Sequence, residues 1–206
     1  MSKKRIHSSL PITAAQQALL ADIPNISLVG LMGSGKSTVG RILASTLKRP
    51  YFDSDEEIVS RTGASVPTIF EIEGEAGFRE REAKVIRELS EKQQVIISTG
   101  GGAVLREDNR AALKAGGLVV YLSTTPERLL MRTRYDRNRP LLQNPDPLGT
   151  LKKMHEFRHP IYSQMADIIV TTGSGQVAQV AMHIIEAISK KIVKEQAFAQ
   201  SAGVES

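Results

Sequence analysis

The sequence predicts an α/β protein in which a parallel β-sheet carries helices on both faces. Five short apolar runs alternate along the chain with longer segments of helical spacing, which is typical of sheets built from strand–helix–strand units. The runs are mostly apolar at successive positions, so both faces of each strand are expected to be buried. The 206 residues contain no internal repeat and no linker-like stretch, which favours a single main domain.

The first half of the chain contains three of the expected strands. Each is a short apolar run bounded by turn-forming residues, and the segments between the runs have helical spacing. The strands are expected at residues 26–29, 51–52 and 95–98. Helices are expected from the glycine-rich loop to about residue 47, twice within 56–73 on either side of Gly63, and over 75–92.

The second half contains the other two strands, expected at 118–122 and 168–170. Gly116 can end a helix that precedes the fourth strand, and Thr124 to Glu127 form a Thr-x-x-Glu capping box that can begin the next helix. Further helices are expected over 106–115, from 126 onward, over 148–164 and over 176–195.

The ends of the chain differ from its middle in composition. Residues 1–24 have no clear period and are interpreted as an N-terminal arm, residues 25–195 as the domain, and residues 196–206 as a disordered tail. Within the domain, residues 136–147 hold three prolines and two asparagines, which favours a loop, so we expect a mobile lid over about 133–147.

The composition excludes several classes of protein. The chain has no cysteine, which rules out a disulfide scaffold, a thiol nucleophile and a thiolate metal site, and it fits the cytoplasm, where we expect the protein. No apolar run approaches the length that spans a bilayer, so no membrane association is expected. The net charge is +5, but the arginines gather over 127–139 and aromatic residues make up only 4%, so we expect a small phosphate-rich ligand and no nucleic acid.

The strongest motif is a phosphate-binding loop. Residues 30–37 read Gly-Leu-Met-Gly-Ser-Gly-Lys-Ser, which matches G-x-x-x-x-G-K-[ST], between an expected strand and an expected helix. Backbone N–H groups of such a loop can wrap a polyphosphate, Lys36 can neutralise its oxygens, and the Ser37 hydroxyl can ligate Mg²⁺. A chance match of a glycine-rich turn is the alternative. The motif by itself indicates a nucleoside triphosphate site and leaves the reaction open.

Two carboxylates follow the second expected strand. Asp53 and Asp55 are two residues apart, so on a strand they would point the same way. Ligands of open α/β sheets bind beyond the carboxyl ends of the strands, and both carboxylates are therefore expected to face the phosphate site. One can serve the metal and the other can accept a hydroxyl proton or orient the hydroxyl. The alternative is an N-cap cluster for the next helix.

Other candidates are ambiguous when taken singly. Gly100, Gly101 and Gly102 follow a strand and would allow a ligand or another chain segment to approach closely, although a flexible turn is the alternative. Arg79 and Arg158 could each be an ordinary solvated charge on a helix. Residues 155–159 spell H-E-x-x-H, a zinc-protease motif. Pro160 follows directly and strains a helix there, and Arg158 inside the motif belongs to another pattern, so we do not expect a zinc site.

Together these motifs resemble the shikimate kinases of aromatic amino-acid biosynthesis. The resemblance spans about residues 25 to 190 and keeps the family's order and spacing. The residues that carry it are Gly30 to Thr38, Phe52-Asp53-Ser54-Asp55, Gly74-Glu75, Phe78 to Glu82, Ser98 to Gly102, Arg139-Pro140-Leu141-Leu142 and Arg158-x-Pro-x-Tyr162.

The resemblance implies a three-layer P-loop kinase fold, with strand order 2-3-1-4-5, and a role for each matching residue. Asp55, Lys36 and Arg139 would be catalytic, Arg139 as the arginine of the lid. Asp55, Arg79, Gly101 and Arg158 would bind shikimate, and Ser37 and Asp53 would hold Mg²⁺. The nucleotide would contact Gly33, Ser34, Gly35, Lys36, Ser37, Thr38, Arg132, Arg139 and Gln176.

The function implied is transfer of the γ-phosphoryl of ATP to the 3-hydroxyl of shikimate by a monomer, with Mg²⁺ as cofactor. Two alternatives are kept. One is a kinase for another small hydroxy acid such as gluconate, which need not carry Asp55, Arg79 and Arg158 together. The other is a ligand-sensing regulatory module on the same fold, but only about 25 residues precede the first strand, too few for a DNA-binding helix-turn-helix.

Overall fold

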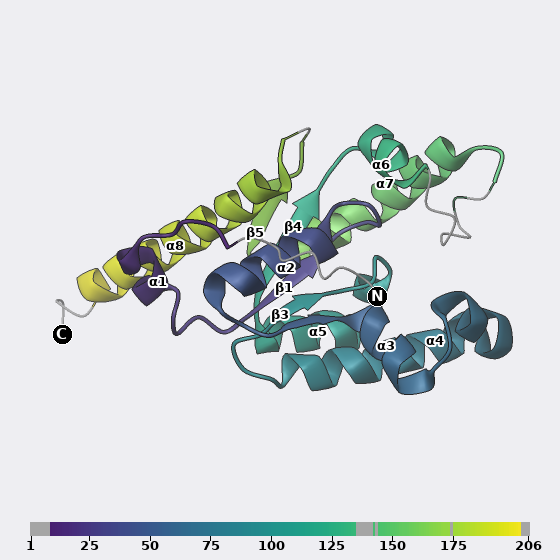
Figure 1. Cartoon of the computed structure of the whole chain (residues 1–206), viewed down its shortest axis with the longest axis horizontal. Coiled ribbons are helices and arrows are strands. Elements are labelled where there is room, and N and C mark those ends of the chain that lie inside the picture. The colour runs from purple at the N-terminus through teal and green to yellow at the C-terminus, as the bar shows by residue number, and fades with distance from the viewer. Residues whose placement is uncertain (1–8, 135–141, 143, 174, 203–206) are drawn as a thin grey trace.

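The computed structural model describes residues 9–134, 142, 144–173 and 175–202. In this part of the chain, five parallel strands form one sheet with the order β2-β3-β1-β4-β5 (Figure 1). The strands are β1 (Asn25–Val29), β2 (Tyr51–Asp53), β3 (Ile96–Ser98), β4 (Gly117–Ser123) and β5 (Ile168–Thr171). The predicted α/β class, the five-stranded parallel sheet and its strand order are confirmed.

Helices connect the strands and cover both faces of the sheet. They are α1 (Ala14–Leu19), α2 (Lys36–Leu47), α3 (Ser54–Thr62), α4 (Val66–Ser90), α5 (Glu107–Gly116), α6 (Pro126–Thr133), α7 (Pro147–Met165) and α8 (Val177–Ala202). A short 3-10 helix, η1 (Ala103–Leu105), follows the third strand. No helix was expected from the sequence at the position of η1.

The core divides between the two faces because side chains alternate along each strand. On one face, β1 and β4 side chains such as Leu28 and Val120 pack against α2 and α8, together with Leu20 and Ile23, which follow α1. On the other face, Val119 and Tyr121 of β4 pack against η1, α5, α6 and α7. A third cluster joins α3 and α4 to Ile97 of β3, and Ile86 of α4 also packs in the cluster of the second face. The three-layer arrangement therefore leaves the carboxyl ends of β1, β2 and β3 facing a common space.

Two helices test the sequence-based boundaries. α4 is interrupted at Gly74, whose backbone (φ 71°, ψ −177°) is not helical, so the expected break between residues 73 and 75 is confirmed. α8 continues to Ala202, past the expected end near 195, because the alanines at 197 and 199 are strong helix formers. The last four residues, 203–206, lie outside the described part of the chain.

The segment before β1 packs on the domain. Thr13 and Gln16 form a capping box that begins α1, and Leu20 and Ile23 are buried with the core side chains of α2 and α8. The Leu10 N–H donates to Thr46 Oγ1 of α2 at 2.9 Å. The division into arm, domain and tail stays a prediction, but residues 9–23 contribute to the same core as the sheet.

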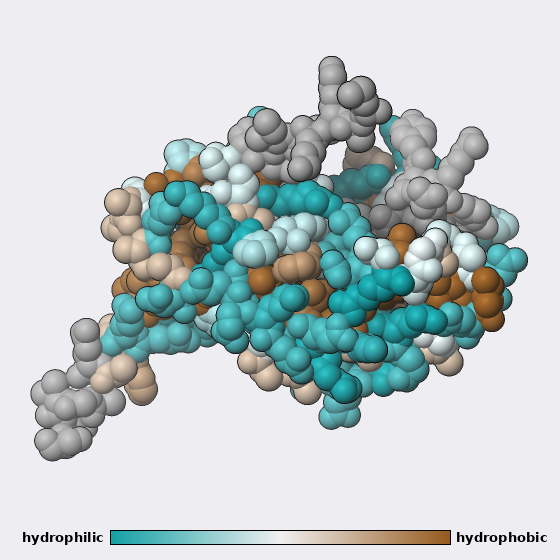
Figure 2. Space-filling view, turned by 60° about the horizontal axis from the view of Figure 1, so that its bottom comes forward, coloured by the Kyte–Doolittle hydropathy of each residue, from teal (hydrophilic) through white to brown (hydrophobic). Residues whose placement is uncertain are grey.

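The surface in Figure 2 is mostly hydrophilic, and the apolar residues on that face lie in separate patches. None of the described helices combines the length and the apolar character that crossing a bilayer requires.

Candidate active site

The phosphate-loop motif lies between β1 and α2, as its sequence context predicts. Gly35 precedes the first residue of α2 and has φ 100°, a left-handed conformation that favours glycine. Gly30 lies so close to β4 that a Cβ atom would be 2.7 Å from the carbonyl oxygen of Leu122. No side chain caps α2, so the first N–H groups of the helix remain directed at the loop. This arrangement is the usual anion-binding end of a helix.

Lys36 is held against the loop that it follows. Its Nζ donates to the carbonyl oxygens of Gly30 at 2.8 Å and Leu31 at 3.0 Å, and the residue is only 8% exposed. Because a buried ammonium group needs several acceptors, these carbonyls keep the charge close to the space inside the loop. The geometry suits neutralisation of a bound polyphosphate.

Oxygen ligands gather next to the loop at the end of β2. The Ser37 hydroxyl donates to Asp53 Oδ2 at 2.9 Å, and the Tyr51 hydroxyl donates to the same oxygen at 3.1 Å. Ser98 Oγ of β3 lies 3.5 Å from Ser37 Oγ. Hydroxyl and carboxylate oxygens are what Mg²⁺ prefers, so Ser37 and Asp53 fit the role predicted for them. Neither Tyr51 nor Ser98 was given a role from the sequence, because their approach to Ser37 and Asp53 depends on which strands are neighbours.

The expectation that Asp53 and Asp55 share one strand is wrong. β2 ends at Asp53, and Asp55 lies in the first turn of α3. Asp53 Oδ1 accepts the N–H of Asp55 at 3.1 Å, so Asp53 is also the N-cap that the alternative interpretation foresaw. Both carboxylates still line one cavity of about 740 Å³ together with the phosphate loop. The helix cap, not strand alternation, turns them toward the same space.

Three consecutive glycines bring the candidate substrate residues together. A Cβ atom on Gly100 would lie 2.8 Å from Asp55 Oδ1, and one on Gly102 would lie 2.6 Å from an Arg79 guanidinium nitrogen. The carbonyl oxygen of Gly101, between them, accepts a hydrogen bond from Arg158 at 3.0 Å. A side chain at either outer position would displace a charged group. The close approach of Asp55 and Arg79 to this segment therefore explains why glycines stand here, and a flexible turn is not needed to explain them.

Glu82 is a member of this group that the sequence analysis did not assign. It is fully buried, its Oε2 accepts from Arg79 at 2.7 Å, and its Oε1 lies 2.8 Å from the position of a Gly100 Cβ atom. The signal that could have revealed it is its spacing, since residues three apart on a helix share a face. Arg79 also contacts Glu75 at 3.1 Å, so its guanidinium is oriented by two carboxylates on α4.

Burial raises the pKa of the Glu82 carboxyl above its ordinary value of 4.5, and the attraction of Arg79 offsets only part of this shift. Between pH 4.5 and the raised pKa, the folded chain therefore keeps more of this proton than the unfolded chain does. The contribution of Glu82 to the free energy of unfolding accordingly falls as pH rises through this interval. We expect the wild type to lose stability relative to Glu82→Gln as pH rises above 4.5, as measured by denaturant unfolding at a series of pH values.

The matched control for this pH effect is Glu75→Gln. Glu75 also contacts Arg79, but its side chain is 67% exposed. Its removal tests whether the loss of one Arg79 contact by itself changes the free energy of unfolding. A free energy of unfolding of the wild type that stays constant or rises with pH relative to that of Glu82→Gln would contradict this prediction.

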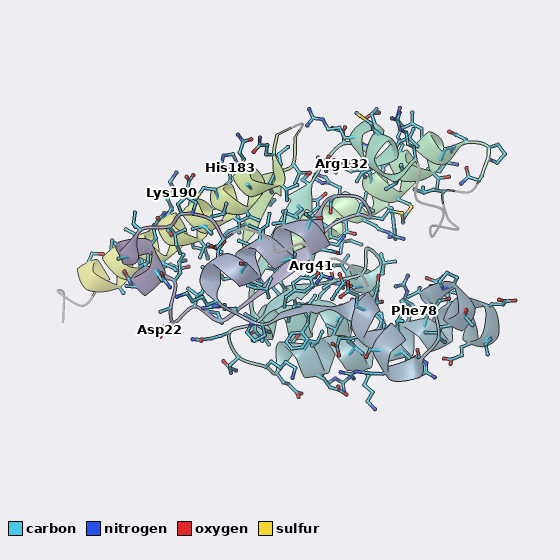
Figure 3. The ribbon with its side chains drawn as sticks, in the orientation of Figure 1. Asp22, Arg41, Phe78, Arg132, His183 and Lys190 are labelled. Carbon is cyan, nitrogen blue, oxygen red and sulfur yellow. The ribbon has the colours of Figure 1, made fainter. Side chains whose placement is uncertain are left out.

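Arg132 joins the phosphate loop to the segment before α8. Its guanidinium donates to the carbonyl oxygens of Gly33 at 3.3 Å and Gly173 at 2.6 Å and to Thr172 Oγ1 at 3.2 Å. Figure 3 shows Arg132 in the space between α6 and the loop that leads into α8. Arg128, which the sequence analysis did not assign, lines the same cavity.

The structure says less about Gln176 and Arg139, the other two residues predicted to contact the nucleotide. Gln176 is exposed, its carbonyl oxygen accepts the N–H of Gln179 at 3.0 Å, and its neighbours Gly175 and Val177 line the cavity. Arg139 lies outside the described residues, as does most of the expected lid over 133–147.

The H-E-x-x-H motif has a different environment from a zinc site. His155 and His159 stack with ring centroids 5.0 Å apart, and His159 Nδ1 lies 3.0 Å from the Tyr121 hydroxyl. Within the part of the chain that the structure describes, no three His, Cys, Asp or Glu side chains group as a metal site. His159 is thus part of a hydrogen-bonded aromatic cluster behind Arg158.

Known proteins resemble the chain in both sequence and fold. A family model described as shikimate kinase matches residues 32–189. The shikimate kinase of Burkholderia lata is 54% identical over 153 residues, covering 74% of this chain and 83% of that protein. The shikimate kinase of Dechloromonas aromatica is 55% identical over 154 residues, covering 75% and 84%.

Solved structures of shikimate kinases also share the fold of this chain. Shikimate kinase from Acinetobacter baumannii, determined in complex with shikimate, has a TM-score of 0.82 and 44% identity over 85% of this chain and 98% of its own. Shikimate kinase from Aquifex aeolicus has a TM-score of 0.72 and 41% identity over 81% and 97%. The family match covers the phosphate loop from residue 32 onward, the acidic residues of β2 and α3, the three glycines and both candidate arginines. The chain belongs to the shikimate kinase family.

Proposed function

We propose that the chain transfers the γ-phosphoryl group of ATP to the 3-hydroxyl of shikimate, which yields ADP and 3-phosphoshikimate. The observation that carries this proposal is the contact of Gly100, Gly101 and Gly102 with Asp55, Arg158 and Arg79, respectively. Asp55, Gly100 and Gly101 line the same cavity as the phosphate loop, and the two guanidinium groups lie against Gly101 and Gly102 at its border. That combination suits a small hydroxy acid as the phosphoryl acceptor.

Asp55 acts on the attacking hydroxyl. It accepts the hydroxyl proton as the oxygen–phosphorus bond forms and the bond between the γ-phosphorus and the bridging oxygen breaks, and ADP leaves with that oxygen. Its place in the first turn of α3 brings one carboxylate oxygen against Gly100, at the boundary between the substrate residues and the loop. Much of the rate enhancement then comes from alignment of the reacting groups.

Arg79 and Arg158 bind the carboxylate of shikimate. A planar guanidinium offers paired donors that match a carboxylate. Nε of Arg158 is buried and has no hydrogen-bond partner among the described residues, so it is a donor that a bound carboxylate can satisfy. Arg79, oriented by Glu82 and Glu75, supplies the second guanidinium. Gly101 contributes backbone contact to the substrate.

The nucleotide occupies the loop, and Mg²⁺ is its cofactor. Backbone groups from Gly33 to Thr38 bind the phosphates, with Lys36 as the main neutralising charge, while Arg132 and Gln176 contact the nucleoside part. Ser37 and Asp53 would hold the metal, which supplies additional positive charge on the phosphate oxygens when bound. Arg139 is proposed as a further phosphate-binding and catalytic arginine on the sequence resemblance.

The direct test is ADP release from ATP, measured with shikimate, with gluconate and without an acceptor. We expect release to depend on shikimate and on Mg²⁺. Equal rates with gluconate would favour the alternative of a kinase for another hydroxy acid, and shikimate binding without any ADP release would favour a sensor module. Monomeric state and cytoplasmic location stay predictions from the sequence.

Replacing Arg79 or Arg158 with lysine should mainly raise KM for shikimate. Lysine keeps the positive charge but loses the paired donors of guanidinium, so each change should cost about 2 kcal/mol, the scale of a hydrogen bond to a charged group. Steady-state kinetics with each substrate varied in turn measures the effect. The control is Arg87→Lys, because Arg87 is exposed and lies in the last turn of α4. A loss of ATP affinity with constant shikimate affinity would contradict the carboxylate role.

A further inference from the structure

Tyr162 shares its hydrogen-bond acceptor with the candidate carboxylate-binding arginine. Arg158 and Tyr162 lie four residues apart on α7 and therefore on the same face of the helix. The Tyr162 hydroxyl donates to the carbonyl oxygen of Gly101 at 2.5 Å, and an Arg158 guanidinium nitrogen donates to the same oxygen at 3.0 Å. One carbonyl oxygen thus takes both donors, one for each of its lone pairs.

The aromatic ring of Tyr162 has little freedom to move. The residue is fully buried, and its ring stacks on that of Tyr121 with centroids 4.8 Å apart and 21° between the planes. Tyr121 in turn is tied to His159 through its hydroxyl. Burial raises the pKa of the Tyr162 hydroxyl, so the group remains a hydrogen-bond donor under ordinary conditions. A rigid donor therefore fixes where the Gly101 carbonyl lies.

The position of that carbonyl decides how Arg158 is presented. One guanidinium nitrogen of Arg158 is used on Gly101, and the buried Nε is left as a donor for a ligand. The neighbouring Gly100 N–H donates to Ser54 Oγ at 3.0 Å, which holds the glycine segment from its other end. If Gly101 shifted, the planar guanidinium would turn with it, and its free donors would no longer match a carboxylate in the same place.

We propose that Tyr162 is a positioning residue for substrate recognition: it holds the Gly101 carbonyl, the carbonyl holds Arg158, and Arg158 binds the carboxylate of shikimate. The inference rests on the proposed function, because it assumes that Arg158 meets that carboxylate. Tyr162 itself touches neither the substrate nor the nucleotide in this scheme. Its removal should therefore affect shikimate affinity selectively.

The test uses Tyr162→Phe, which keeps the stacked ring and removes only the donor. We expect its Kd for shikimate, measured calorimetrically without nucleotide, to rise about tenfold, equivalent to about 1.4 kcal/mol. KM for ATP and kcat at saturating shikimate should change less than about twofold, a separation that general destabilisation would not produce. Tyr121→Phe, which breaks the contact with His159 in the same cluster, is the matched control and should leave shikimate affinity unchanged.

A double-mutant cycle with Arg158→Ala shows whether Tyr162 acts through the arginine. Adding Tyr162→Phe to Arg158→Ala should weaken shikimate binding no further, because the group that Tyr162 positions is already absent. Three results would overturn the inference alone, provided that Arg158→Ala weakens shikimate binding: unchanged affinity in Tyr162→Phe, the same loss in both backgrounds, or an equal loss in Tyr121→Phe. Normal shikimate affinity in Arg158→Ala would instead refute the carboxylate role of Arg158, and the inference with it.

Discussion

Replacing Asp55 with asparagine should lower kcat by at least about 10²-fold, the usual scale for loss of a general base. Asparagine has nearly the same size and can still form hydrogen bonds, but it cannot take the proton of the attacking hydroxyl. The backbone N–H of residue 55 would still donate to Asp53, so the start of α3 should be preserved. KM for ATP should change little, because Lys36 and the loop remain intact.

The matched control for Asp55→Asn is Glu56→Gln. Glu56 lies next to Asp55 in the first turn of α3 and carries the same charge, but its side chain is 61% exposed and pairs with Arg41 on the surface. Both changes remove one negative charge from the same end of the helix, so their effects on helix stability should be similar. Near-normal turnover in Asp55→Asn, or an equal loss in Glu56→Gln, would contradict the assignment.

Replacing Lys36 with methionine should lower kcat by about 10²–10³-fold, as when one stabilising donor is removed from a reacting centre. Methionine fills a similar volume but carries no charge, and the charge on the transferring phosphoryl group would lose its nearest neutralising side chain. The change also removes the hydrogen bonds from Nζ to the carbonyl oxygens of Gly30 and Leu31, so some loss of loop order and of ADP affinity should accompany it.

Two measurements separate the loss of charge from general damage. Thermal unfolding should show that Lys36→Met remains folded, and Lys114→Met is the control for removing a lysine. Lys114 pairs with Asp167 on the surface, and neither residue lines the cavity that holds the phosphate loop. Turnover in Lys36→Met within about tenfold of the wild type would show that the ammonium group has no direct part in charge stabilisation.

Much of the fold could be predicted because its signals are local. An apolar run followed by Gly-x-x-x-x-Gly-Lys-Ser and a helical pattern specifies the first strand, the loop and α2 without any knowledge of distant contacts. The start of α6 was predicted, but its N-cap is Thr125 and not Thr124: the Thr125 hydroxyl accepts the Arg128 N–H. Gly74 marked a break in the helical pattern and proves to be the kink in α4. The strand order needed the resemblance, since the spacing of the strands alone allows several orders.

The sequence by itself determined the phosphate loop, the alternation of strands and helices, and the identity of the charged residues that the family resemblance singles out. Only the tertiary structure decided that Asp55 belongs to a helix, that Glu82 orients Arg79, and that Tyr162 and Arg158 meet on one carbonyl oxygen. The physical reason is the separation along the sequence of the residues that interact. Caps, turns and helical periodicity depend on residues within one or two turns, whereas Gly101 meets Tyr162 across 61 positions, and such a contact exists only once the sheet order and the facing of α4 and α7 are set.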